Sequence, residues 1–445
     1  MSFFSERDAH NRLATLFAAQ AKNLTRSGNR SEISHFMDSI EKPHIQKGAR
    51  AFVLGSSGLI AYLAFLSAFV PISTDLYLPA LPGMSAYFGV TPELTNLSLS
   101  LFMLFYALSM LLWGPFSDKY GRKRILLISL LLYIAASARL ALCQSIVQLI
   151  VWRCVQALGS GALSAVSLAI VKDTYRGRIM ENVITAIQTM VVLAPMLAPV
   201  LGGFLLTFTS WRGIFWVLAA CGCAALLGWF ALRETCEQRT QGSVAAALGR
   251  IRHVLRHEEF RVLLLVFSVG SMSFMAYLAS SAYIYIELFR VTPQHYSYFF
   301  AANAAASALG PLLYVSFLRN LPRREFIACC FAATGILGAC IILFGASGPF
   351  TFALLFAPVT ICGSALRPAT TMLLMNQIDT DTGTVSALIG STSLLFGGLS
   401  MLLCSLPWDS FILAMGSMSV IVGLVCTSGW LWIDRERAFS GKQAK

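Results

Sequence analysis

Apolar stretches dominate this chain from residue 52 to residue 433, and short polar segments separate them. A helix needs about 20 residues to cross a hydrocarbon layer about 30 Å thick, and each stretch is long enough to do so. None of them shows the alternating pattern of a membrane β-barrel, and membrane helices tolerate the glycines and prolines inside them. The pattern predicts an all-α polytopic membrane protein. We expect twelve transmembrane helices, at residues 52–82, 94–117, 125–144, 146–171, 182–209, 213–232, 262–286, 295–318, 326–346, 349–376, 383–406 and 410–433.

Composition supports the same class. Hydrophobic residues make up 57% of the 445 residues and charged residues 12%, whereas a soluble domain carries about 25% charged residues. A water-soluble globular protein is therefore excluded. Ten of the 11 cysteines lie inside apolar stretches and are interpreted as small buried hydrophobic residues. Because no cysteine pair has zinc-type spacing and the histidines lie in tails, loops or at a span edge, we expect no metal and no cofactor.

The distribution of basic residues predicts the orientation in the membrane, since loops rich in Lys and Arg stay on the cytoplasmic side. With the N-terminus inside, 28 of the 33 Lys and Arg residues fall in cytoplasmic tails and loops. Both termini and the linker 233–261 are then cytoplasmic. The net charge of +12 follows from this topology, so nucleic-acid binding is not needed to explain it.

The long polar linker divides the spans into six and six. We expect a polar N-terminal tail (1–51), a six-helix bundle (52–232), the linker (233–261), a second six-helix bundle (262–433) and a short tail (434–445). A weak internal repeat supports two related halves, because residues 114–124 after the second span have a degraded counterpart at residues 319–324.

Four segments carry a resemblance to a known family. Residues 114–124 (Gly-Pro-Phe-Ser-Asp-Lys-Tyr-Gly-Arg-Lys-Arg) resemble the loop signature of the major facilitator superfamily, in the position where that family has it. Residues 153–161 resemble the Arg-x-x-Gln-x-x-Gly motif of its drug:proton antiporters. Residues 194–203 resemble the antiporter signature, and residues 71–82 resemble the first-helix signature of the bicyclomycin- and chloramphenicol-resistance branch.

The resemblance implies the major facilitator fold and a transporter rather than an enzyme. It implies proton-coupled efflux of small, moderately apolar drugs or toxic compounds across the inner membrane by alternating access, by a monomer whose partners are its substrate, protons and the lipid bilayer. A transporter of a specific metabolite, such as an amino-acid derivative, a sugar or a siderophore, is the alternative. A membrane-embedded enzyme would need a nucleophile–base pair or a metal cluster within the spans, and the spans offer no such group.

Asp75 is the only acidic residue in the sequence that we place within the depth of a span. An ionisable group there is a functional candidate because its burial is costly. Arg153 falls at a similar depth in the fourth span, at 1.5 Å per residue. We therefore expect the two residues to face each other and to carry the proton coupling. The competing interpretations are that Asp75 only caps a helix break, and that Arg153 only ties backbone carbonyls of a broken first helix.

The loop signature predicts a conformational latch at the cytoplasmic face. Its residues are Gly114, Asp118, Gly121, Arg122 and Lys123. The two glycines permit a tight turn, and Asp118 can accept hydrogen bonds at the positive end of a neighbouring helix. By resemblance that neighbour is the eleventh span, and the basic residues would contact lipid headgroups or Asp379.

The antiporter signature places Pro195, Pro199, Gly202 and Gly203 in the fifth span, where they would kink the helix and allow close contact at the seam between the halves. Polar or amphipathic residues within spans are candidates for the substrate cavity. These are Tyr77, Gln156, Gln188 and Asn303. Arg367 falls toward the cytoplasmic end of the tenth span, where we interpret it as a structural residue that snorkels to the surface.

Overall fold

The computed structural model describes residues 51, 53, 55–236, 244–316, 321–377 and 382–439. Twelve helices in this part of the chain are long and apolar enough to cross a membrane, which confirms the predicted class and the predicted number of spans. The predicted N-terminal tail up to residue 50, the centre of the linker and the last six residues lie outside the described residues.

The first bundle contains the first six spans. Its helices are α3 (Gly55–Ser67), α4 (Phe69–Asp75), α5 (Leu81–Phe88), α6 (Pro92–Tyr120), α7 (Arg122–Ala141), α8 (Ile146–Thr174), α9 (Gly177–Leu205) and α10 (Trp211–Ala231). The linker contains the short helix α11 (Val244–Leu255).

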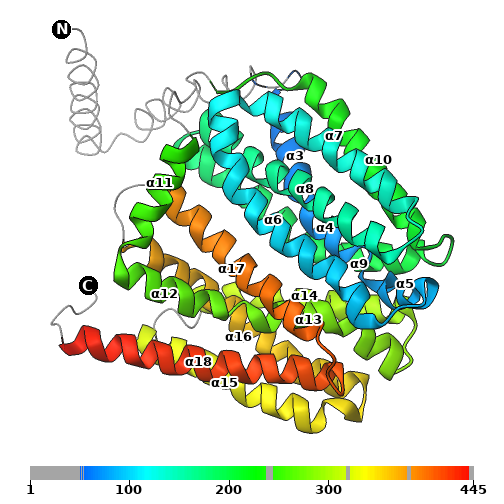
Figure 1. The fold of residues 1–445 in the computed structure, drawn as a ribbon. Helices are drawn as coiled ribbons and strands as arrows, with labels where there is room; N and C mark the ends of the chain where they lie inside the picture. Colours follow the sequence, from blue (N-terminus) through cyan, green and yellow to red (C-terminus); the bar gives the residue numbers. More distant parts are fainter. Residues whose placement is uncertain are drawn as a thin grey trace, which may run out of the picture.

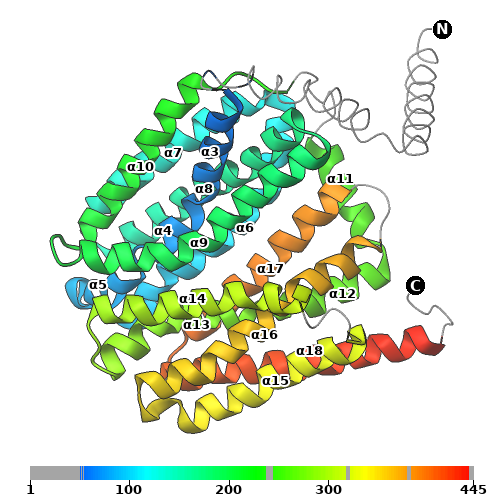
Figure 2. The same cartoon turned by 180° about the vertical axis from the view of Figure 1, so that it is seen from behind.

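The second bundle contains the remaining spans. Its helices are α12 (Glu258–Val269), α13 (Met272–Ala282), α14 (Pro293–Ser316), α15 (Arg323–Phe344), α16 (Pro349–Met375), α17 (Thr382–Cys404) and α18 (Phe411–Phe439). Figure 1 shows the two bundles as separate groups, with α6 facing α17. Figure 2 shows the same arrangement from behind, where α9 runs beside α14. α18 continues as a helix beyond the predicted end of the last span at 433.

The first span of each bundle is irregular, which the hydropathy pattern did not predict. In the first bundle α4 ends at Asp75, a 3-10 turn covers Leu78–Ala80, and α5 follows. Pro79 and Pro82 lack the N–H that a continuous helix would use, so the ladder is interrupted there. In the second bundle α12 and α13 are separate segments, and a π-helix follows at Tyr283–Leu288.

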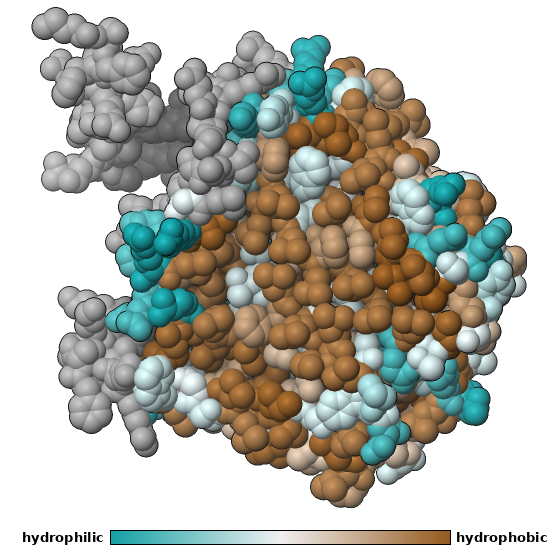
Figure 3. Space-filling model, viewed as in Figure 1, coloured by the Kyte–Doolittle hydropathy of each residue, from teal (hydrophilic) through white to brown (hydrophobic). Residues whose placement is uncertain are grey.

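The outer surface of the bundles is apolar. Figure 3 shows hydrophobic residues over most of the visible face, with hydrophilic residues near its margins. Large side chains such as Leu227, Ile336 and Leu354 are 72%, 66% and 74% exposed. An apolar surface of this extent is compatible with lipid and incompatible with water. Inside the second bundle, Gly335 and Gly423 bring α15 and α18 into backbone contact, as small residues do in membrane helix packing.

The helix ends define two sides of the molecule. We call the side with the loops after α6 and α8 and the linker the basic end, and the opposite side the distal end. All hydrogen bonds that cross between the bundles within the described residues lie in the distal half. They join Asn96 to Ala279, Tyr283 to Ser85 and Pro92, and Ser100 to Ser405. The bundles are therefore joined at the distal end.

Candidate functional site

Asp75 is the last residue of α4 and lies at the break in the first span. Its side chain is 4% exposed and accepts a hydrogen bond of 2.9 Å from the Thr74 hydroxyl. The turn that follows it packs against α14 of the second bundle. The structure thus places this carboxyl group where the broken first span meets the other bundle.

Arg153 is fully buried within the first bundle. Its Nη1 donates to the backbone carbonyl of Ser73, at 3.0 Å, and to Oε1 of Gln156, at 2.7 Å. Gln156 in turn donates to the Ser137 hydroxyl, at 2.8 Å. These contacts fasten α4 to α8 just before the break. They match the interpretation of Arg153 as a tie to the broken first helix.

The Arg153 guanidinium also lies between two aromatic rings. Its Cζ is 4.3 Å from the ring centroid of Tyr77 and 4.2 Å from that of Phe102. Nε and Nη2 are buried and have no hydrogen-bond partner. Among the described residues Arg153 makes no ion pair with Asp75, so the expected direct pairing is absent from this conformation. Asp75 instead accepts from Thr74 of its own helix, while Tyr77, beyond the break, packs on the Arg153 guanidinium.

The glycines of the antiporter-like segment lie in the seam between the bundles. A Cβ atom on Gly202 would overlap the carbonyl oxygen of Leu76, the residue after Asp75. A Cβ atom on Gly203 would lie 2.5 Å from Oγ of Ser297, in the first turns of α14. Pro195 and Pro199 lie inside α9, three to eight residues before these contacts along the helix. α9 is thus wedged between the broken first span and the second bundle.

The four cavity candidates are not brought together. Tyr77 and Gln156 are fully buried in the packing around Arg153. Asn303 is 8% exposed and accepts from the Thr360 hydroxyl at 2.9 Å. Gln188 is exposed on α9. Tyr77 and Gln156 make their contacts within the first bundle, and their place in a substrate cavity stays a prediction.

Arg122 and Asp118 of the loop signature form an ionic cluster with Asp173 of α8 at the basic end. Arg122 is 7% exposed and pairs with Asp118, and its Nε donates to Asp173 at 2.9 Å. Gly121 alone separates α6 from α7, at φ 96°, a conformation that favours glycine. The expected turn at Gly114 is wrong, since α6 continues as a helix to Tyr120. The expected contacts with Asp379 lie outside the described residues.

Glu234, the third residue after α10, completes this cluster. Its carboxylate accepts from the backbone N–H groups of Arg122, at 3.0 Å, and Lys123, at 3.3 Å. It thereby caps the start of α7, whose first N–H groups have no partner within the helix. The Lys123 ammonium lies 4.6 Å from the ring centroid of Trp229. The sequence analysis missed Glu234, although an acidic residue directly after the sixth span was a visible signal.

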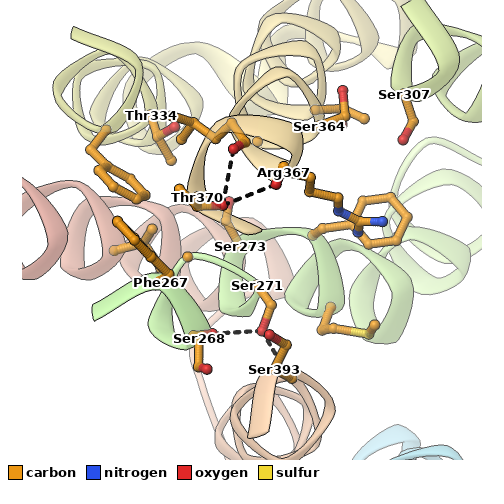
Figure 4. A pocket seen from close by; sticks show the side chains of 18 of the residues that line it. Phe267, Ser268, Ser271, Ser273, Ser307, Thr334, Ser364, Arg367, Thr370 and Ser393 are labelled. Carbon is orange, nitrogen blue, oxygen red and sulfur yellow. Dashed lines mark hydrogen bonds between the residues drawn. The ribbon is translucent and has the colours of Figure 1, made fainter. Parts of the chain in front are cut away.

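A cavity of about 360 Å³ lies within the second bundle. Ten serine and threonine side chains line it, together with Phe267, Phe274, Phe331 and Phe356. Arg367 of α16 is the charged residue among the described residues that line it, and its side chain is exposed. Figure 4 shows Arg367 extending away from Thr370, toward the side of the cavity where Ser307 lies.

Arg367 was interpreted from the sequence as a snorkelling residue, and the structure differs. Arg367 lies eight residues before the end of α16, roughly 12 Å from the basic end at 1.5 Å per residue. Its depth therefore agrees with the sequence, but its side chain faces the cavity. The rotation of α16 about its axis determines which way Arg367 points. The hydropathy pattern of a mostly apolar helix does not predict this rotation.

Known proteins match this chain over most of its length. Residues 63–400 match the model of the Major Facilitator Superfamily. An uncharacterized MFS-type transporter of Bacillus subtilis, YdgK, is 26% identical over 398 residues, which cover 87% of this chain and 96% of that protein. A chloramphenicol resistance protein of Pseudomonas aeruginosa is 27% identical and covers 83% of this chain and 91% of its own length. A bicyclomycin resistance protein homolog of Haemophilus influenzae is 27% identical, over 64% of this chain and 72% of that protein.

Solved structures share the fold. The crystal structure of a D-xylose–proton symporter has a TM-score of 0.66 at 12% identity, covering 83% of this chain and 96% of that chain. A bacterial homolog of the human lysosomal transporter Spinster, in an inward-facing and unoccupied conformation, has a TM-score of 0.62 at 16% identity, covering 86% and 95%. At these identities the likeness concerns the fold alone.

Proposed function

The chain belongs to the major facilitator superfamily of membrane transporters, and on that premise we propose that it exports small, moderately apolar compounds across the inner membrane in exchange for protons. The similarity to proteins named for resistance to chloramphenicol and bicyclomycin supports drug efflux. Two bundles of six spans support alternating access, in which the bundles rock against each other around a central substrate site.

The position of Asp75 at the distal seam is the observation that carries the proton coupling. A carboxylate charge is costly there, since Asp75 is 4% exposed and ends a helix whose C-terminus already bears negative charge. Separation of α9 from α14 would open the seam and hydrate Asp75. Proton exchange with the distal side then accompanies opening of the distal end, and a neutral Asp75 accompanies its closure.

Arg153 supports this cycle by holding the end of α4 in place. Its hydrogen bond to the Ser73 carbonyl fixes the backbone two residues before Asp75. Its unpartnered Nε and Nη2 offer donors to a deprotonated Asp75 that moves toward α8 when the seam opens. The residue is therefore assigned a positioning role in the closed state and a charge-compensating role in the open state.

The basic end is assigned to the cytoplasm. The Lys and Arg residues of the loops after α6 and α8 and of the linker gather there, as the positive-inside rule requires. A Gly242→Cys variant in a background without the native cysteines tests this orientation. A membrane-impermeant maleimide should label it in inside-out vesicles and leave it unlabelled in intact cells. Labelling in intact cells would show that the basic end faces the outside instead.

Proton release on substrate binding tests the role of Asp75. The full-length protein is purified in weakly buffered detergent, chloramphenicol is added as the first probe, and released protons are followed with a pH indicator. Wild type should release protons, and Asp75→Asn should release none. Asp409→Asn, which changes an exposed carboxylate in the loop before α18, serves as the matched control and should behave as wild type. Undiminished release from Asp75→Asn would show that another group carries the proton.

The substrate class is tested separately by expression in a bacterial strain that lacks its major efflux pumps. Wild type should raise resistance to one or more small apolar drugs in a panel that also contains amino-acid derivatives, sugars and siderophores. Protection against drugs that is lost in Asp75→Asn supports proton-driven efflux. Transport confined to one metabolite would replace drug efflux with the metabolite alternative.

A further inference from the structure

The cavity in the second bundle contains a positive charge without a counter-ion. Among the described residues no hydrogen-bond or ion-pair partner accepts from the Arg367 guanidinium, and no carboxylate lines the cavity. Arg153, a buried arginine of the spans, is by contrast tied to a carbonyl and an amide oxygen. The Arg367 guanidinium thus lies on the cavity wall at membrane depth, with no acidic side chain of the described residues beside it.

A cation at this depth is costly unless something compensates its charge. An ordinary structural arginine in a span pairs with a carboxylate, with backbone carbonyls or with the headgroup region. Arg367 does none of these among the described residues, and its cavity is lined by helices of its own bundle. The guanidinium is therefore free to bind an anion that enters the cavity. Five N–H donors in a planar fork suit a carboxylate, which accepts two of them side by side.

The rest of the lining matches an amphipathic molecule. Phe267, Phe274, Phe331 and Phe356 offer apolar and aromatic surface, while serine and threonine hydroxyls supply both donors and acceptors. The Ser268 hydroxyl is buried and has no partner, so it is available to a ligand. A volume of about 360 Å³ falls in the range of pockets for small organic ligands.

We propose that this cavity binds a small aromatic or otherwise apolar carboxylate, with Arg367 holding the carboxylate and the phenylalanines packing around the apolar body. As an assignment of cargo, this deepens the proposed function and rests on it. A fatty acyl lipid is disfavoured as the occupant, because the cavity lies inside the ring of helices, whereas lipid contacts the outer surface. Small anionic amphiphiles are therefore inferred to be among the substrates and to bind more tightly than their neutral analogues.

Equilibrium binding of an acid and its amide tests the proposal without any proton gradient. The probes are radiolabelled 1-naphthylacetate and 1-naphthylacetamide, which differ in charge but hardly in shape, with full-length protein in detergent at pH 7.5. Wild type should bind the acid at least tenfold more tightly than the amide. Arg367→Gln should bind the two alike, and Arg367→Lys should keep part of the preference. Arg139→Gln, which removes an exposed arginine at the distal end of α7, should keep all of it.

A cavity-filling variant identifies the place of binding and guards against misfolding of Arg367→Gln. Gly390 lines the cavity, and a Cβ atom on it would meet nothing within 4 Å. Gly390→Leu should therefore fold and weaken binding of acid and amide together, about tenfold or more. Gly83→Leu is the matched control, because Gly83 of α5 also has open space around it but lies outside the cavity.

Four outcomes would overturn the proposal. They are equal affinity of wild type for acid and amide, absence of saturable acid binding, a preference that survives in Arg367→Gln, and unchanged binding in Gly390→Leu. Displacement of the acid by an equal concentration of phosphatidylglycerol would assign the site to a lipid headgroup and also refute it. Asp75→Asn should keep the acid preference. Absence of substrate-induced proton release from wild type, with an intact acid preference, would refute the proposed function alone. Normal proton release without an acid preference would refute only this inference.

Discussion

Gly202 of α9 lies so close to Leu76 that the Leu76 carbonyl oxygen occupies the space where a Cβ atom on Gly202 would be. Leu76 directly follows Asp75 at the break in the first span. One residue further, Gly203 approaches Ser297 of the second bundle. α9 therefore contacts both sides of the seam through adjacent glycines. Any movement of α9 relative to α14 is transmitted to the backbone beside Asp75.

Gly202→Ala should disturb this contact. The added methyl group meets backbone atoms, which cannot rotate away as a side chain would, so the helices must separate or strain. We expect a loss of about 1–3 kcal/mol in the free energy of unfolding, as for overpacking in a core. Substrate-induced proton release should fall strongly, because the position of Asp75 changes. Thermal unfolding in detergent and the proton-release assay measure the two effects.

Gly83→Ala is the control for Gly202→Ala. Gly83 lies in a helix of the same span, and a Cβ atom there would meet nothing within 4 Å. This variant should keep both stability and proton release. If Gly202→Ala also behaved as wild type, the close approach between α9 and the first span would not be needed for coupling.

Arg153→Ala should destabilise the first bundle. The Ser73 carbonyl and the Gln156 side chain would each lose a buried partner, at a cost of about 1–3 kcal/mol for each unsatisfied group. Arg153→Lys should lose less, because an ammonium can still reach one acceptor. Thermal unfolding of the two variants, with exposed Arg139→Ala as the control, measures this difference. An unchanged unfolding temperature in Arg153→Ala would contradict the tie between α4 and α8.

The number and order of the spans could be predicted from the sequence because burial in lipid requires long apolar helices. The lengths of the apolar stretches then allow only one span in each. The depth of Asp75, Arg153 and Arg367 followed in the same way, from a fixed rise per residue. The prolines near Asp75 suggested a helix break only as a competing interpretation, since membrane helices often accommodate proline without a break.

Side-chain direction was harder to predict. Asp75 and Arg153 lie at the expected depths, yet Asp75 accepts from Thr74 and Arg153 is tied to Ser73. Arg367 faces a cavity, although its depth alone suggested the surface. In a helix that is apolar all round, the sequence carries no amphipathic stripe to fix rotation. For contacts between distant segments, such as Glu234 with the start of α7, the sequence indicates a polar residue but not its partner.

Asp118→Asn should impair transport while leaving substrate binding and stability nearly unchanged. Asp118 is partly exposed, and its buried partner Arg122, one turn away, keeps its hydrogen bonds to Asp173 and Ser117 when Asp118 becomes an amide. Its effect on transport would therefore come from the equilibrium between conformations of the bundles. Binding to purified protein is compared with transport in cells.

Glu258→Gln, which breaks the exposed pair of Glu258 with Arg261 at the same end, is the control and should transport normally. Equal loss of binding and transport in Asp118→Asn would assign the residue to folding.

The Cys236 thiol reports whether the start of the linker stays docked on this cluster. Burial raises the pKa of Cys236, the nearby Asp173, Glu234 and Asp118 raise it further, and Arg122 opposes them. A raised pKa leaves less thiolate at neutral pH, and the thiolate is the reactive form. Alkylation of Cys236 by iodoacetamide should therefore be slower than that of a model peptide at pH 7.5. Its rate should keep rising, about tenfold per pH unit, beyond the pH at which the peptide levels off.

Glu234→Gln should accelerate this alkylation. The substitution removes a negative charge beside the thiol and weakens the cap on the N–H groups of Arg122 and Lys123, so the pKa of Cys236 moves back toward its ordinary value. More thiolate is then present at pH 7.5, and the linker exposes it more often. Mass spectrometry of the peptide that contains Cys236 measures the rate apart from the cysteines within the bundles, with Glu258→Gln as the unaffected control. A wild-type rate equal to that of the peptide, or a Glu234→Gln rate equal to that of wild type, would show that the linker is not held at the start of α7.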